Sequence, residues 1–185
     1  MSVAQPLPHD AAHRHVTGAS RYVDDTPTPA GTLHLAFGIS DAACGTLNGM
    51  DLNAVRAAPG VVAVLTAADL PFDNDVSPSA HDEPLLATDA VHYMGQPVFL
   101  VIADTHLRAR GAAQEHFYLE GQAALAMPGE DGDMHVISST QHPTEIQHKV
   151  AEAIGVHMHA VRVETRRMGG GFGGKESQGN ALAVA

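Results

Sequence analysis

The segment RRMGGGFGGKESQG, residues 166–179, holds six glycines around a single Phe and then places Lys175 beside Glu176. A plain turn needs one or two glycines, whereas a denser run leaves backbone N–H groups bare and open to close approach. The segment therefore predicts a backbone surface that holds an oxygen-rich anionic group. Phe172 would form an apolar wall, and Glu176 would accept hydrogen bonds from the N–H groups of a heterocycle.

Two nucleotide-binding patterns also match this segment. Gly169, Gly171 and Gly174 satisfy GxGxxG, and Gly169 with Gly174 and Lys175 satisfies GxxxxGK. A phosphate-binding loop needs Ser or Thr after the Lys to hold magnesium, and here that position is Glu176. A dinucleotide-binding loop needs an acidic residue about 20 positions further on, beyond the last residue of the sequence. A nucleotide-binding module and a tight turn without ligand stay open as alternatives.

Charge excludes one class of partner. The chain has 185 residues and a formal net charge of −11, and no Lys or Arg occurs between Arg56 and Arg108. Such an acidic half repels nucleic acid.

Cys44 is the only cysteine, which rules out a disulfide or a Cys-ligated iron–sulfur cluster within the chain. We expect no membrane span, because no apolar run approaches about 20 residues, and a cytoplasmic location.

Periodicity predicts mixed α/β structure. An exposed tail is expected first, and the alternation of Leu33, Leu35, Phe37 and Ile39 then indicates a strand. A polar stretch, 71–84, is expected to be a surface loop. The remaining expected elements are a helix over 51–60 with Asp51 as N-cap, buried strands over 61–65 and 97–104, a strand over 135–139, a helix over 142–155 with Pro143 in its first turn, and a strand over 159–168.

Other candidate chemistry is weak. His142, Glu145 and His148 resemble metal ligands, but a spacing of six residues turns the two imidazoles well apart around a helix. The histidines of the tail have no carboxylate or Cys to complete a metal site. Cys44 has no activating neighbour in the sequence and is expected to be a buried small residue.

The glycine segment acquires a specific meaning together with its neighbours. The stretches QEHFYLEGQAALA (114–126), SSTQHPTEIQHKVAEAIG (138–155) and VETRRMGGGFGGKE (163–176), in this order, resemble the molybdenum-binding subunit of the xanthine dehydrogenase and aldehyde oxidase family. In the first half, GTLHLAFGISDAACGTL, DLNAVRAAPGVVAVLTAADLP, DEPLLA and VHYMGQPVFLVIAD resemble the α/β-hammerhead domain of the same family.

The resemblance implies an α+β (mixed α/β) chain: a flexible tail over 1–17, a hammerhead-like domain over 18–113 that is incomplete at its C-terminal end, and the N-terminal fragment of a molybdopterin-binding domain over 114–185. It implies a molybdenum-molybdopterin cofactor and hydroxylation of an electron-poor carbon in a purine such as xanthine or hypoxanthine. Electrons would leave through iron–sulfur clusters and FAD on a partner subunit, which fits the single cysteine.

Site residues follow from the matching motifs. Gln114 is similar to the family's glutamine near the molybdenum centre, and Gly171, Phe172 and Gly173 match the loop over the metal. Glu176 matches the carboxylate that contacts the purine, with Phe172 beside the substrate. No residue is expected to ligate molybdenum directly, because molybdopterin holds the metal.

Departures from the family pattern set a limit. The general-base glutamate and a substrate-anchoring arginine of the family have no counterpart in this sequence. Between Ala113 and Gln114 the family normally carries several dozen further residues. We therefore expect a truncated and internally shortened member without turnover of its own. A non-catalytic remnant that associates with partner subunits is a further alternative.

Overall fold

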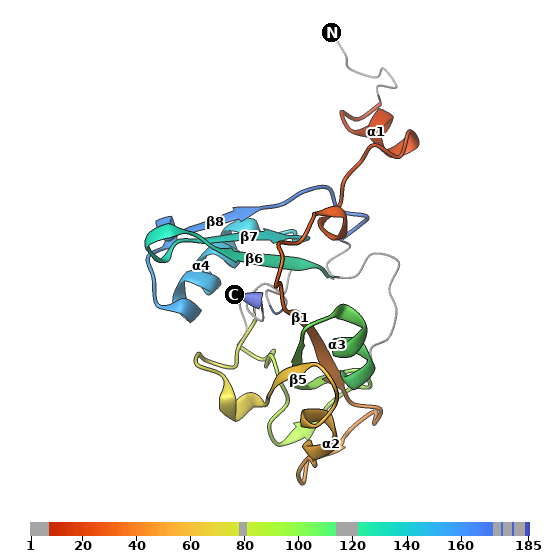
Figure 1. The fold of residues 1–185 in the computed structure, drawn as a ribbon, viewed down its shortest axis with the longest axis vertical. Coiled ribbons are helices and arrows are strands. Elements are labelled where there is room, and N and C mark those ends of the chain that lie inside the picture. Colours follow the sequence, from red (N-terminus) through yellow and green to blue (C-terminus); the bar gives the residue numbers. More distant parts are fainter. Residues whose placement is uncertain (1–7, 78–80, 114–121, 172–174, 176–178, 180–183) are drawn as a thin grey trace.

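The computed structural model describes residues 8–77, 81–113, 122–171, 175, 179 and 184–185. These residues form two separate three-stranded sheets, each with a helix packed against it, and a small two-stranded ribbon (Figure 1). Helices and strands alternate along the chain, which confirms the predicted mixed α/β class.

The first sheet has the order β1-β5-β3 and is antiparallel throughout. Its strands are β1 (His34–Ile39), β5 (Pro97–Ala103) and β3 (Val61–Leu65). Helix α3 (His106–Ala113) contacts all three strands. A small apolar cluster fills this contact, and its buried members are Ala36, Val101, Ala103, Ala109 and Ala113.

The central strand of this sheet is apolar on both sides. Val101 packs under α3, whereas Leu100 belongs to a second cluster on the opposite face. The predicted burial of the 97–104 strand is confirmed in this sense. The strand predicted over 61–65 is confirmed as β3, but its predicted burial is wrong, since β3 is an edge strand in which only Val64 is buried and Val62 is 59% exposed.

A short helix and the ribbon complete the first half. Helix α2 (Asn53–Arg56) begins after Leu52, so the predicted N-cap at Asp51 is wrong by one residue, although the Asp51 carboxylate accepts a hydrogen bond from the Asn53 N–H at 3.0 Å. The ribbon pairs β2 (Gly45–Thr46) with β4 (Ala90–Val91). Cys44, which precedes it, is exposed, so the predicted burial of this thiol is wrong.

The second sheet is a hairpin followed by a crossover. Strands β6 (Ala124–Pro128) and β7 (Met134–Ser138) are antiparallel, and β8 (Val161–Glu164) runs parallel to β7. Helix α4 (Pro143–Ile154) connects the parallel pair and packs on it. Its start at Pro143 and its left-handed C-cap at Gly155 confirm the predicted helix, because proline fits the first helical turn and glycine tolerates a positive φ.

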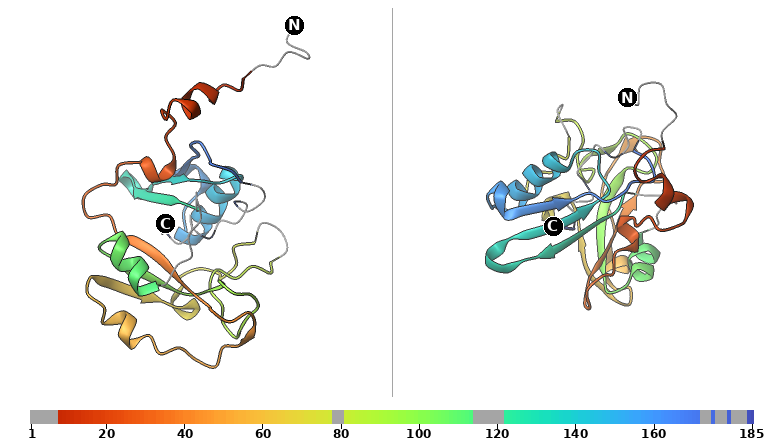
Figure 2. Two further views of the ribbon diagram at one scale, coloured as in Figure 1. Left: turned by 90° about the vertical axis from the view of Figure 1, so that its right-hand side faces the viewer. Right: turned by 90° about the horizontal axis from the view of Figure 1, so that it is seen from above.

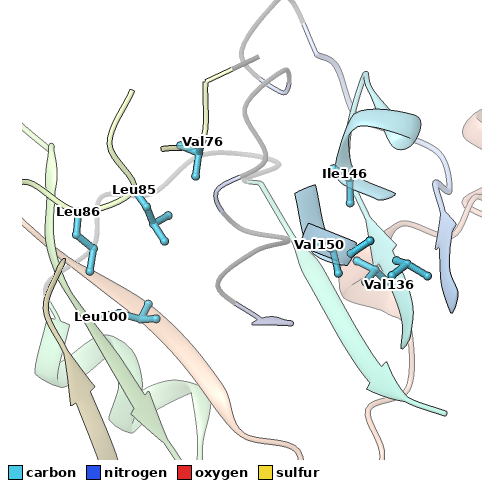
Figure 3. Packing of buried hydrophobic residues seen from close by; sticks show 9 residues of the cluster. Val76, Leu85, Leu86, Leu100, Val136, Ile146 and Val150 are labelled. Atoms are coloured by element: carbon cyan, nitrogen blue, oxygen red, sulfur yellow. The ribbon is translucent and has the colours of Figure 1, made fainter. Parts of the chain in front are cut away.

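Buried apolar residues from both halves form one cluster (Figure 3). Val76, Leu85, Leu86 and Leu100 come from the first half, and their counterparts in the second half are Val136, Ile146, Val150, Ala151 and Val161. Half-buried Ala185 also packs against this cluster, so the C-terminal residue lies near both sheets (Figure 1).

The N-terminal segment extends away from the rest of the chain (Figure 2). From residue 8 onwards it contains a five-residue helix, α1 (Ala12–Val16), with no buried residue. Further helical pieces are the 3-10 turns η1 (Val23–Asp25), η2 (Ala67–Asp69), η3 (Glu130–Gly132) and η4 (Met158–Ala160).

Candidate functional site

The parallel pairing of β7 and β8 brings two loops to the same edge of the second sheet. Ile137 lies opposite Glu164 at the carboxyl ends of the two strands. One loop runs from β7 into α4, and the other runs from β8 into the glycine segment. In α/β structures, ligands characteristically bind outside the carboxyl ends of parallel strands, so this edge is the natural place for a site.

The β7–α4 loop is polar and nevertheless buried. Ser138, Ser139 and Thr140 are each at most 5% exposed. The Thr140 hydroxyl accepts a hydrogen bond from the His142 N–H at 3.0 Å, at the point where α4 begins. Buried hydroxyl groups need hydrogen-bond partners, and Lys175 of the glycine segment provides them for Ser139 and Thr140.

Among the described residues of the glycine segment, Lys175 makes several hydrogen bonds to this loop. Its Nζ donates to the Ser139 hydroxyl at 2.8 Å, and its side chain is buried. The Lys175 carbonyl accepts from the Gln141 N–H at 3.0 Å and from the Thr140 hydroxyl at 3.3 Å, while the Lys175 N–H donates to the Gln141 side-chain oxygen at 3.3 Å.

Gly171 lies against the same glutamine. A β-carbon at this position would come within 2.6 Å of the Gln141 side-chain oxygen, so residue 171 has to be a glycine for Gln141 to keep its place. Of the predicted site residues, Gly171 is thus located at the sheet edge. Gln114, Phe172, Gly173 and Glu176 lie outside the described residues.

Three residues follow β8 and lead into the glycine segment. Each of them contains a buried polar atom that has no hydrogen-bond partner among the described residues. These atoms are the hydroxyl oxygen of Thr165 and the Nε atoms of Arg166 and Arg167. Another nitrogen of Arg166 pairs with the Glu164 carboxylate at 3.0 Å, and this carboxylate also lies 3.4 Å from the His135 imidazole. Buried donors without partners are costly, and a bound polar group is one way of satisfying them.

A groove of about 360 Å³ lies between the first turn of α4 and β8. The Gln147 amide at this groove donates to the carbonyls of Met158 and Val161 at 3.0 and 2.7 Å. Gly171, the one predicted site residue that the structure describes, does not line the groove; the lining residues are Pro143, Thr144, Gln147, His159, Val161, Arg162 and Val163.

The structure does not support a metal site formed by His142, Glu145 and His148. The His148 imidazole lies 3.9 Å from the Glu145 carboxylate. Within the described part of the chain, no three His, Cys, Asp or Glu side chains gather closely enough to hold a metal ion. In the same part, no helix has the length and apolar character needed to cross a membrane.

Ser139, Thr140 and Gln141, which hold the glycine segment, were not predicted as site residues. A usable signal was present: three polar residues directly follow an apolar strand, and the strand after the next helix ends in the glycines. For two parallel strands joined by a helix, both loops must lie at one edge of the sheet.

Comparison with known proteins connects this geometry to a family. A family model described as the aldehyde oxidase and xanthine dehydrogenase a/b hammerhead domain matches residues 17–116. The chain belongs to the aldehyde oxidase and xanthine dehydrogenase family. A second model, described as a molybdopterin cofactor-binding domain, matches residues 101–185 and so includes the glycine segment and both loops. The resemblance seen in the sequence is confirmed.

Relatives match the whole length of the chain. Xanthine dehydrogenase of Oryza sativa is 32% identical over 244 residues, covering 100% of this chain and 18% of the rice protein. Nicotinate hydroxylase of Emericella nidulans is also 32% identical, over 98% of this chain and 18% of that protein. Quinoline 2-oxidoreductase from Pseudomonas putida has the same fold, with a TM-score of 0.80 and 20% identity over 100% of this chain and 33% of its own.

The chain is internally shorter than its rice relative. The alignment runs over 244 positions and the chain has 185 residues, so 59 aligned positions have no residue here. This difference agrees with the expected loss of several dozen residues. The whole match spans less than a fifth of the rice protein.

Proposed function

We propose that this chain supplies part of the molybdenum-molybdopterin site of an oxidoreductase that hydroxylates purines. Membership of the family and the match to a molybdopterin cofactor-binding domain support the cofactor. Residues from two loops form the site at the carboxyl edge of β7 and β8, where the glycine segment is held by hydrogen bonds to residues 139–141.

The observation that carries the proposal is the set of buried donors in Thr165, Arg166 and Arg167 that have no partner among the described residues. Molybdopterin is anionic through its phosphate and offers many oxygen acceptors. Guanidinium groups bind phosphate through charge-assisted hydrogen bonds, and these are stronger than hydrogen bonds between neutral groups. A cofactor of this chemistry fits these donors.

The chain's own residues contact both the cofactor and the substrate in this proposal. Gly171, Phe172 and Gly173 bind the cofactor through the main chain, and Gln114 contacts it from the preceding segment. Phe172 also stacks against the planar substrate, while Glu176 accepts hydrogen bonds from its ring N–H groups. When bound, the molybdenum cofactor supplies the redox chemistry that hydroxylates an electron-poor ring carbon.

The substrate class rests on Glu176. A carboxylate that accepts ring N–H hydrogen bonds suits xanthine or hypoxanthine, and the rice relative is a xanthine dehydrogenase. The equally similar Emericella relative is a nicotinate hydroxylase, which is also named for an aromatic nitrogen heterocycle. Both names favour a heterocycle over an aliphatic aldehyde.

The chain is proposed to work with a second subunit that carries iron–sulfur clusters and FAD. The only cysteine of the present chain, Cys44, is exposed, and a single cysteine cannot ligate an iron–sulfur cluster. We also propose that the chain does not turn over alone, because its sequence offers no match to the family's general-base glutamate. We propose that several dozen of the 59 absent positions belong to the junction of residues 113 and 114.

Cofactor binding tests the proposal directly. The 185-residue chain, incubated with molybdenum-loaded molybdopterin and separated from free ligand, should retain molybdenum and pterin in equal amounts. Retention of neither would identify a non-catalytic remnant. Magnesium-dependent binding of a nucleotide in place of the pterin would favour the nucleotide-binding alternative. Steady-state xanthine oxidation by the chain alone would contradict the proposed lack of turnover.

A further inference from the structure

The chain has two lysines, and they differ in how deeply they are buried. Lys149 is half-buried on α4, whereas Lys175 is only 6% exposed in the middle of the glycine segment. Ordering a long lysine side chain in the interior costs rotamer entropy and desolvation. A lysine kept at such a position has to gain specific contacts there.

Lys175 is bonded through its main chain and its side chain together. The amine donates to Ser139, the N–H donates to Gln141, and the carbonyl accepts from Thr140 and Gln141. We call these four residues the Lys175 clasp. Its contacts join positions 34 to 36 residues apart in sequence.

The main-chain bonds alone would tolerate almost any side chain at position 175. They attach the backbone of residue 175 to Thr140 and Gln141. The amine contact with Ser139 adds an attachment through the side chain, which reaches a third residue of the β7–α4 loop. The backbone and side-chain attachments together fix both the position and the direction of the chain at residue 175.

We propose that Lys175 is a positioning residue that sets the register of the glycine segment on the β7–α4 loop. The proposal rests on the proposed function, since Glu176 is the next residue and residues 172–174 bridge Lys175 to Gly171. Consecutive Cα atoms are about 3.8 Å apart, so fixing residues 171 and 175 restricts what the residues between and beside them can reach. Lys175 acts on cofactor and substrate through these neighbours.

Amine labelling tests the clasp without any cofactor. With a water-soluble amine-reactive reagent and mass spectrometry, Lys149 should label at least about fivefold faster than Lys175, because a buried and hydrogen-bonded amine is poorly accessible. Ser139→Ala should raise the labelling rate at Lys175 severalfold and leave that of Lys149 unchanged. Equal labelling of both lysines, or no response to Ser139→Ala, would overturn the clasp.

Cofactor retention then tests the positioning role. Lys175→Met keeps the length of the side chain and removes its donor. It should weaken molybdopterin binding by up to about tenfold, because the lost charge-assisted hydrogen bond holds the loop and does not contact the cofactor itself. Lys175→Arg should recover most of this loss, and Lys149→Met is the matched control that should bind like the unmodified chain. Hydrogen exchange at the Gln141 amide should accelerate in Lys175→Met.

The outcomes separate the two proposals. Unchanged binding and unchanged Gln141 exchange in Lys175→Met would reject the positioning role even if the unmodified chain binds the cofactor well. If Lys175→Met does not fold, Ser139→Ala replaces it in the same assay. A chain that shows the predicted labelling and exchange but binds no molybdopterin would retain the clasp and reject the proposed function.

Discussion

Gly38 and Phe99 lie opposite each other in β1 and β5, and the Phe99 ring occupies the space that a β-carbon on Gly38 would need. The ring packs between two apolar clusters, one under α3 and one formed by Ala87, Val91 and Val98. A missing side chain in one strand thus makes room for an aromatic ring in its neighbour, and the ring connects two parts of the first half.

Gly38→Ala should therefore destabilise the chain by about 1–3 kcal/mol, the usual cost of overpacking a well-filled core. Gly45→Ala is the matched control: Gly45 is also in a strand, and no described atom lies within 4 Å of the position that its β-carbon would take. Thermal or urea unfolding measures both variants. A loss of stability in Gly45→Ala as large as that in Gly38→Ala would contradict the role of Phe99.

The loop that contains Asp75 should lose stability in acid. Its carboxylate accepts hydrogen bonds from the N–H and hydroxyl of Ser77 at 3.0 and 2.6 Å and lies 2.5 Å from the His81 imidazole. Burial by itself raises the pKa of Asp75, but the bonds from Ser77 and His81 outweigh it and lower the pKa from 3.8 to about 2.

Because the folded pKa of Asp75 lies below the unfolded value, its contribution to stability is complete above about pH 4 and is lost as the pH falls towards 2. Asp75→Asn should cost about 1–2 kcal/mol at neutral pH and flatten the pH dependence of the unfolding free energy in this window. Asp73→Asn, which changes an exposed carboxylate two residues away, should keep the dependence of the unmodified chain. Identical pH profiles for the unmodified chain and Asp75→Asn would count against the prediction.

Two glycines near helix ends should respond to alanine in opposite directions. Gly155 has φ 72° and caps α4, so Gly155→Ala should cost about 1 kcal/mol, because a β-carbon disfavours the left-handed conformation. Gly111 lies within α3, and the described residues leave room for a β-carbon there, so Gly111→Ala should gain about 0.5–1 kcal/mol. Urea unfolding of both variants checks the signs, and a stabilising Gly155→Ala would contradict the capping role.

Arg167 provides a test of the anion-binding chemistry. Arg167→Gln removes the guanidinium, whose buried Nε has no partner among the described residues, and should weaken molybdopterin binding by about tenfold or more, as expected for a hydrogen bond to a charged group. Arg162→Gln removes an exposed guanidinium from the same region and is the control. Equilibrium binding at two salt concentrations distinguishes them. Equal weakening by both changes would indicate a diffuse charge effect in place of a contact.

The βαβ part of the second half was predicted from the sequence, because its signals are local, but β6 was not predicted and β8 ends at Glu164, four residues before the predicted end. Pro143 and Gly155 mark the two ends of α4, and Val161 and Val163 mark β8. The first half was harder to predict. β3 looks like a buried strand because it is apolar, yet its place at the sheet edge, which depends on pairing with β5, exposes Val62.

In the candidate site, too, local sequence features were predicted and long-range contacts were not. Glycine density and family resemblance pointed to residues 169–176, and the structure locates Gly171 and Lys175 of this segment. The partners at 139–141 were not predicted, because the signal for them lies in the pairing of two strands and not in the residues next to the glycines, which are more than 30 positions away. Burial of Cys44 was wrong for a related reason: its exposure depends on how the short ribbon is placed, and spacing alone does not encode that.

The parallel pairing of β7 and β8 makes the candidate site a product of tertiary structure. Residues 139–141 and Lys175 are far apart in sequence, so an unfolded chain does not hold them together. Unfolding of the βαβ unit would therefore disperse the residues proposed to hold the cofactor.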